Sequence, residues 1–310
     1  MSSVATFAVL ALSVALADPA SPQAAPAAPA APAVADPAAA PHAMDKTRLL
    51  AMLIDGDHGM IVATFRRHPG RTLPFVDGFL EGGLAIIEKR GDAGAHEAKE
   101  SFRTGIAFAK LADQAFGGSD FADYANAFAS WSREEQRSFR EGQRLFREGM
   151  KLAKDDRAKA IATLEQSLRI TERLDDTWGQ VMAQGGLAGL HIEGESEESA
   201  ARAESSARAA ATLARKVRLD EDRIVALRQL AQAIKRLGQK AEAQATPLQE
   251  AWTLIRKDPS ISAELRDGVG ADLIAVFEAM KRPDAVEATK AELAEMARQA
   301  GAADKANAGA

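Results

Sequence analysis

The 310-residue chain contains no cysteine, which excludes a disulfide scaffold, a thiolate metal site and a cysteine nucleophile. Aromatic residues make up only 5% of the chain, few for an all-β protein, because strands favour aromatic and β-branched side chains. The 39 basic residues do not exceed the 44 acidic ones, so we expect no nucleic-acid partner. The commonest residues are instead good helix formers, such as Ala, Leu, Glu and Arg.

The N-terminal segment predicts export from the cytoplasm. Residues 4–17 form an uncharged, mostly apolar run that is shorter than the roughly 20 residues needed to span a bilayer. The run ends in Ala15-Leu16-Ala17, which fits the small-x-small rule for signal-peptide cleavage, although no basic residue precedes it. We therefore interpret residues 1–17 as a signal peptide and expect a periplasmic or secreted protein without a transmembrane segment after cleavage.

Residues 18–43 predict a disordered linker. They hold 13 Ala and 7 of the 12 Pro of the whole chain. Proline removes backbone donors and disfavours helix in the preceding residue, so this tract is expected to be an extended spacer.

From Met44 onward the apolar spacing is helical, which predicts an all-α fold. Four fragments begin with a leucine that recurs at steps of 42, 43 and 43 residues: Leu145, Leu187, Leu230 and Leu273. Each is followed 18–20 residues later by an apolar residue of a second helix, and Ser132 with Glu135 and Asp284 with Glu287 are spaced as helix-capping boxes. One helix pair cannot bury its apolar stripe alone, so the spacing predicts a helix-turn-helix repeat solenoid with about four helix pairs over residues 133–303.

These fragments resemble the tetratricopeptide repeat family over about residues 136–300. The bulky positions of its first helix match His191, Ile234 and Phe277, and the small position of its second helix matches Ala158, Ala200 and Ala243. Asp258-Pro259 is similar to the proline that ends the repeat. The unit is longer than the usual 34 residues, and Pro247 is expected to kink or shorten a second helix.

The region of residues 44–132 is expected to hold N-terminal capping helices, two short ones over residues 45–67, and a diverged fifth pair over residues 72–116 with Thr72 as its helix cap. A short helix around Asp120–Ser130 separates this pair from the first repeat. Residues 304–310 are expected to form a disordered tail.

No sequence motif predicts a catalytic, cofactor or metal site. The group Asp55, Asp57, His58 and His68 lacks the spacing of a calcium loop or a zinc protease. The glycine pairs do not form a nucleotide-binding turn after a strand. We therefore expect no cofactor.

The resemblance implies that a peptide or protein partner binds on the concave face formed by the first helices. Together with the predicted export and the absence of a catalytic motif, we expect a non-enzymatic, extracytoplasmic scaffold. Counting from each leading leucine, the partner-binding residues are Arg140, Gln143, Arg147, Met182, Gly185, Gly189, Arg228 and Gln232. A partner carboxylate can pair with Arg147 or Arg228, because guanidinium binds a carboxylate bidentately.

Two other functions stay open. One is an exported enzyme or ligand-binding protein with its site in residues 45–130, which requires a convergent set of buried titratable groups. The other is self-association by end-to-end stacking of the solenoid.

Overall fold

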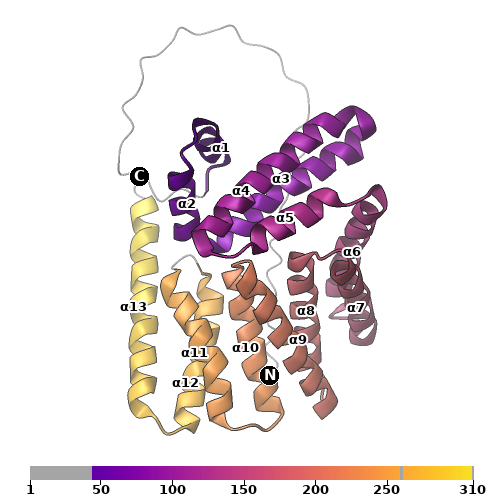
Figure 1. Ribbon diagram of the computed structural model, residues 1–310. Helices are drawn as coiled ribbons and strands as arrows, with labels where there is room; N and C mark the ends of the chain where they lie inside the picture. Colours follow the sequence, from indigo (N-terminus) through magenta and orange to yellow (C-terminus); the bar gives the residue numbers. More distant parts are fainter. Residues whose placement is uncertain (1–43, 259–260, 309–310) are drawn as a thin grey trace. The chain divides into compact units, whose positions relative to one another are not determined.

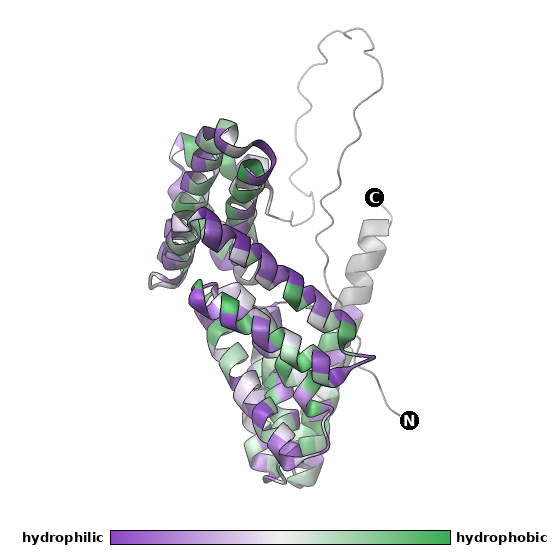
Figure 2. Cartoon of the chain, turned by 90° about the vertical axis from the view of Figure 1, so that its right-hand side faces the viewer, coloured by the Kyte–Doolittle hydropathy of each residue, from purple (hydrophilic) through white to green (hydrophobic). Residues whose placement is uncertain are grey.

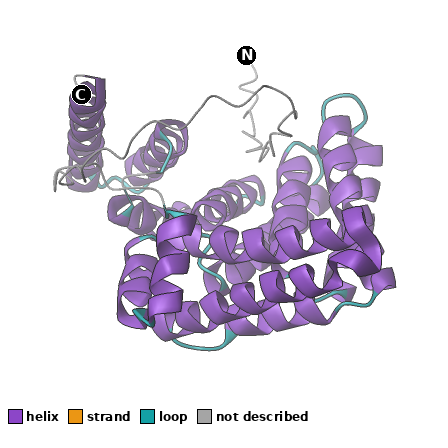
Figure 3. Ribbon diagram, turned by 90° about the horizontal axis from the view of Figure 1, so that it is seen from above, coloured by secondary structure: helices purple, strands orange, loops and turns teal. Residues whose placement is uncertain are grey.

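A computed structural model describes residues 44–258 and 261–308, and those residues form helices joined by short turns (Figure 1). No strand occurs in the described part of the chain, as the secondary-structure colouring in Figure 3 shows. The predicted all-α fold is confirmed. None of these helices combines the length and apolar character needed to cross a membrane.

The N-terminal region contains the helices that the sequence predicts there. Their bounds are α1 (Lys46–Asp55), α2 (His58–Arg67), α3 (Pro69–Arg90), the 3-10 helix η1 (Gly91–Gly94), α4 (Ala95–Phe116) and α5 (Asp120–Ser130). Helix α2 packs on α4 and α3, and α1 packs on α2. The expected cap is wrong, because α3 begins at Pro69 and the Thr72 hydroxyl donates to the carbonyl of His68 inside the first turn.

Eight further helices form four consecutive pairs, which we call the array. Their bounds are α6 (Arg133–Leu152), α7 (Arg157–Arg173), α8 (Thr177–Ile192), α9 (Glu197–Lys216), α10 (Asp220–Arg236), α11 (Ala241–Lys257), α12 (Ala263–Ala279) and α13 (Pro283–Ala308). Each helix packs against the next one along the chain, so the predicted repeat solenoid is confirmed. The helices carry both hydrophilic and hydrophobic residues, as this packing requires (Figure 2).

The repeat positions are buried as the leucine spacing predicts. All four leading leucines, Leu145, Leu187, Leu230 and Leu273, are core residues, and so are the bulky residues His191, Ile234 and Phe277. In the second helices Ala200 is buried, but Ala158 is exposed, so its assignment as a helix-contact residue is wrong. Ala160, two residues further on, takes that place, and its carbonyl lies 3.3 Å from where a Cβ on Gly149 would sit.

Local capping explains most helix starts in the array. The capping box of Ser132 and Glu135 is present, as predicted, and the side chains of Asp156, Asp176 and Ser196 accept from the first turns of α7, α8 and α9. The second predicted box is wrong, because α13 starts at Pro283 and Asp284 lies inside its first turn.

Two further expectations about the helices are corrected. Helix α11 runs through the buried Pro247 for 17 residues, as long as α7, so the proline does not shorten it. Helix α13 extends to Ala308, so the expected disordered tail is wrong for residues 304–308. The predicted signal peptide, the predicted linker and Pro259 lie outside the described residues.

The N-terminal helices lie across one edge of the array instead of continuing it as a fifth stacked pair. Figure 1 shows α3, α4 and α5 crossing near the ends of α8 and α10. Their core is continuous with Leu174 and Val217, which stand at the turns that follow α7 and α9. A Cβ built on Gly70, at the start of α3, would lie 3.9 Å from the backbone of Arg218 and Asp220 in the turn between α9 and α10. The edge of turns is therefore buried by the N-terminal region.

Candidate partner-binding surfaces

The first helices α6, α8 and α10 carry the eight residues that the sequence predicts to bind a partner. None of the eight is buried: Arg147 is exposed and the other seven are half-buried. These residues are therefore accessible to solvent, although the leading leucines of the same helices are buried. We call them the first-helix face; its members are Arg140, Gln143, Arg147, Met182, Gly185, Gly189, Arg228 and Gln232.

At the α6 end, the chain's own helix α3 already binds this face. Arg140 donates from Nη1 to Glu81 Oε2 at 2.5 Å and from Nε to Glu88 Oε1 at 2.7 Å. Gln143 Nε2 donates to the other oxygen of Glu81 at 2.7 Å. Burial opposes the charge of the guanidinium, but these carboxylates together raise the pKa of Arg140. A partner carboxylate must displace Glu81 and Glu88 to reach these two residues.

Arg228 is also held within the array. Its Nε donates to Asp272 Oδ2 of α12 at 2.7 Å. Its guanidinium lies so close to Gly268 that a Cβ there would come within 2.5 Å of Nη1. The glycine thus makes room for a side chain that links neighbouring first helices, and a partner carboxylate has to compete with Asp272.

The middle of the first-helix face is more open. A Cβ added to Gly185 would have no atom within 4 Å, so this glycine leaves empty space in front of α8. Its carbonyl accepts from Gln229 Nε2 at 3.2 Å, which ties α10 to α8. Within the described residues Arg147 and Gln232 make no side-chain hydrogen bond or ion pair. These groups are free to contact a partner.

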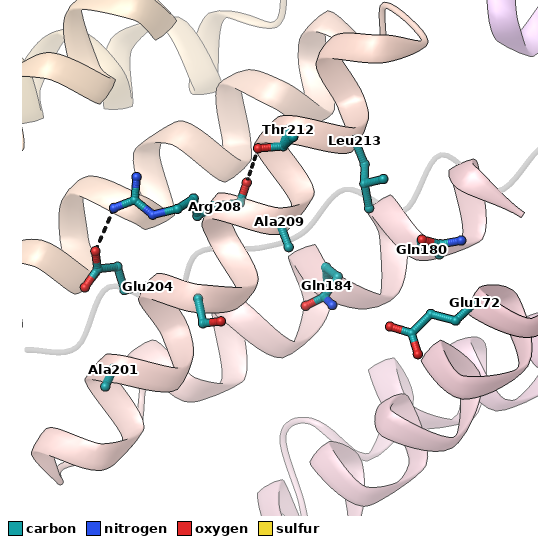
Figure 4. Close-up of a pocket in the computed structure, with 10 residues that line it drawn as sticks. Glu172, Gln180, Gln184, Ala201, Glu204, Arg208, Ala209, Thr212 and Leu213 are labelled. Atoms are coloured by element: carbon teal, nitrogen blue, oxygen red, sulfur yellow. Dashed lines mark hydrogen bonds and ion pairs between the residues drawn. The ribbon is translucent and has the colours of Figure 1, made fainter. Parts of the chain in front are cut away.

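A second surface, which the sequence does not predict, is a groove of about 690 Å³ between α7 and α9. Helix α8 forms its floor with Gln180 and Gln184, and Glu172 lines it from α7 (Figure 4). The lining residues of α9 are mostly small or polar: Ala201, Glu204, Ser205, Arg208, Ala209, Thr212 and Leu213. The groove is wide because α7 and α9 both pack on α8 but hardly on one another.

A buried group of titratable side chains joins the N-terminal region to the array. Tyr124 of α5 donates to Asp77 Oδ1 of α3 at 2.6 Å, and both side chains are buried. Burial raises the pKa of Asp77 to about 8, with further contributions from Glu81 and Asp176, while Tyr124 and Arg140 oppose the shift. Burial therefore favours the protonated form of the Asp77 carboxyl.

Asp176 belongs to the same group. It caps α8 by accepting from the backbone N–H of Gly179 at 2.9 Å. Burial raises its pKa to about 6, against the hydrogen bonds from Gly179 and Trp178. A small cavity of about 230 Å³ borders Tyr124, Asp175 and Lys216. This volume is below the roughly 300 Å³ at which typical ligand pockets begin.

The sequence pattern of α3 indicates that Asp77 is buried. Leu73, Val76, Leu80 and Leu84 are buried along one stripe of α3, and Asp77 stands on that stripe. A carboxylate at such a position requires a partner, but the sequence does not show that the partner is Tyr124.

No group of three or more His, Asp or Glu residues in the described ranges is placed to hold a metal ion. The group Asp55, Asp57, His58 and His68 lies at the ends of α1, α2 and α3. Burial and the neighbouring Arg71 and Arg67 lower the pKa of His68, against the effect of Asp258.

A scan against protein-family models matched none to this chain, and a search of curated proteins found no significant relative.

Proposed function

We propose that this protein is a non-enzymatic, extracytoplasmic scaffold that binds a peptide or protein partner on its first-helix face. The observation that carries the proposal is the open space beside Gly185 of α8, in the middle of that face. On the neighbouring first helices α6 and α10, Arg140 and Arg228 are held by ion pairs within the protein. Stacked helix pairs build extended binding surfaces of this kind. The apolar run of residues 4–17 supports the location outside the cytoplasm.

The ion pairs at both ends of the face indicate how a partner binds. Glu81 and Glu88 of α3 show that a helix carrying carboxylates fits against Arg140, and Asp272 does the same at Arg228. Arg147 lies two turns after Arg140 on α6 and is exposed. We therefore place an acidic group of the partner at Arg147 and its apolar side chain beside Met182 and Gly185.

The test begins with capture of partners from the cell-envelope fraction and continues with binding measurements on a purified partner. Arg147→Glu is expected to weaken binding at least tenfold, because a guanidinium–carboxylate pair becomes a repulsion. Arg169→Glu on α7 is the matched control, since Arg169 is exposed on a second helix. Circular dichroism checks that both variants keep the helical signal. Equal affinity of the two variants would place the partner on another surface.

A second candidate function is an exported enzyme or ligand-binding protein whose site lies in the N-terminal region. The observation in its favour is the buried pair of Asp77 and Tyr124, with Asp176 close enough to raise the pKa of Asp77. Separated pKa values are what acid–base chemistry requires. We rank it second because the cavity beside Tyr124 is small and Asp77 does not line it.

A further inference from the structure

The groove between α7 and α9 lies on the opposite side of α8 from the first-helix face. Gln184 follows Met182 by two residues, which is a rotation of about 200° around a helix. Gln180 and Gln184 face the groove, whereas Met182, Gly185 and Gly189 belong to the first-helix face. The groove is therefore a separate surface.

The dimensions of the groove suit an extended chain. Its lining on α9 runs from Ala201 to Leu213, a length of about 18 Å at 1.5 Å per residue. An extended peptide advances about 3.3 Å per residue, so about five residues fill this length. Ala201, Ser205 and Ala209 have short side chains, so the backbone of a bound peptide has room to lie close to α9.

The polar groups of the groove are only partly satisfied by the protein itself. Glu204 pairs with Arg208 at 2.7 Å, and Thr212 donates to the carbonyl of Arg208, as the dashed lines in Figure 4 show. Glu172 and Gln184, in contrast, make no side-chain hydrogen bond or ion pair with any described residue. In Figure 4 the amide of Gln184 lies between Glu172 on one wall and Glu204 on the other.

These free groups define a ligand chemistry. A glutamine amide offers both donors and an acceptor, which match the C=O and N–H of an extended backbone. The three charged groups of the lining, Glu172, Glu204 and Arg208, leave one negative charge, and the carboxylate that lacks a counter-ion is Glu172. A cationic side chain complements that charge.

We propose that this groove binds an extended peptide segment of a partner protein, with its backbone on Gln184 and a lysine or arginine side chain at Glu172. The inference rests on the scaffold function but concerns a different surface from the first-helix face. A partner spanning both surfaces would contact α8 on opposite sides.

The experiment uses the full chain and three fluorescently labelled heptapeptides, Ala-Ser-Ala-X-Ala-Ser-Ala, in which X is Lys, Gln or Glu. Fluorescence anisotropy measures binding. The Lys peptide is expected to bind about fivefold more tightly than the Gln peptide, the effect of one exposed ion pair, and the Glu peptide most weakly. Failure of the Lys peptide to bind, or equal binding of the Lys and Gln peptides, would overturn the inference.

Variants locate the site. Glu172→Gln is expected to remove the preference for Lys, and Ser205→Trp to block all three peptides by filling the groove from an exposed position of α9. The control is Glu242→Gln, which removes an exposed carboxylate on α11 and should change nothing. If Arg147→Glu alters peptide binding and Glu172→Gln does not, the groove is excluded while the first-helix face, and with it the proposed function, remains supported.

Discussion

The N-terminal region and the array build their cores from different side chains. Among the described residues every aromatic ring–ring contact joins residues from Phe65 to Phe139, and only Phe139, on α6, belongs to the array. The array instead buries mainly alanine, leucine, isoleucine and valine between its helices. A large aromatic ring contacts side chains of several helices at once. Small side chains allow each helix to pack closely against the next one along the chain.

The difference has a consequence for stability. In the N-terminal region one ring touches several helices, so its loss affects all of them. In the array each helix pair relies on the pairs beside it, and the cost of a change is shared between neighbouring interfaces. Where the two regions meet, Trp131 donates to the carbonyl of Leu174 at 3.2 Å and ties the end of α5 to the end of α7.

The largest expected effect is the loss of a central ring. Phe108 is fully buried and its ring meets those of Phe65, Phe75 and Phe79. Phe108→Ala is expected to cost about 3–5 kcal/mol, and Leu273→Ala in the array about 2–5 kcal/mol. Chemical denaturation of both variants measures the two costs.

The position of unfolding separates the two regions further. Hydrogen exchange in Phe108→Ala is expected to rise throughout α2, α3 and α4, whereas in Leu273→Ala it rises mainly in α11, α12 and α13. Identical exchange patterns in the two variants would show that the regions unfold as one unit and would break the comparison.

The sequence predicts features that follow from a regular spacing along the chain, but not contacts between residues that are far apart in it. The positions of Leu187 and Leu230 follow from a local period, so the repeat and the number of pairs are predicted correctly. The contact of Asp77 with Tyr124 joins residues that are 47 apart in the chain, and no local pattern records it. The sequence does not predict the groove either, because the groove lies between two second helices, α7 and α9, that hardly pack on one another.

A similar reason explains the failures at Thr72 and Pro247. Local propensity predicts a helix start at Thr72 and a kinked or shortened helix at Pro247, and α11 is not shortened. The buried positions of both residues show that tertiary packing outweighs these preferences. The ion pairs of Arg140 and Arg228 were not predictable either, since their carboxylates come from other helices.

A further test concerns the pH dependence of the N-terminal region. The folded-state pKa of Asp77 is about 8, above its ordinary value of 3.8, so the folded state binds more protons between these values. The free energy of unfolding is therefore expected to fall with rising pH in this window, by at most about 1.4 kcal/mol per pH unit from this group. Below pH 3.8 the contribution of Asp77 is constant.

Asp77→Asn isolates this contribution, because an amide has a similar shape and does not titrate. Denaturation from pH 4 to pH 8 is expected to give a flatter profile in the variant than in the parent protein. Asp176, with its pKa raised to about 6, adds a slope of the same sign up to that pH in both proteins. Glu242→Gln, which removes an exposed carboxylate of α11, is the control. Parallel profiles in all three proteins would mean that Asp77 is not the titrating group.

The smallest expected effect compares glycines of the two regions. In the N-terminal region a Cβ on Gly83 would come within 2.6 Å of the Phe102 ring, so Gly83→Ala is expected to destabilise the fold. In the array Gly185 stands in open space, and Gly185→Ala is expected to stabilise α8 by up to about 1 kcal/mol, the helix preference of alanine over glycine. Gly186→Ala is the control within α8, because its Cβ would lie 3.0 Å from Leu164 and 3.2 Å from Met150, and it should not gain as much. Thermal denaturation measures all three.

The affinity of a captured partner for Gly185→Ala tests the role of this glycine in binding. If the variant is more stable and binds the partner more weakly, the glycine serves binding at the expense of stability. If it is more stable and binds the partner equally well, the open space beside Gly185 is not part of the binding surface.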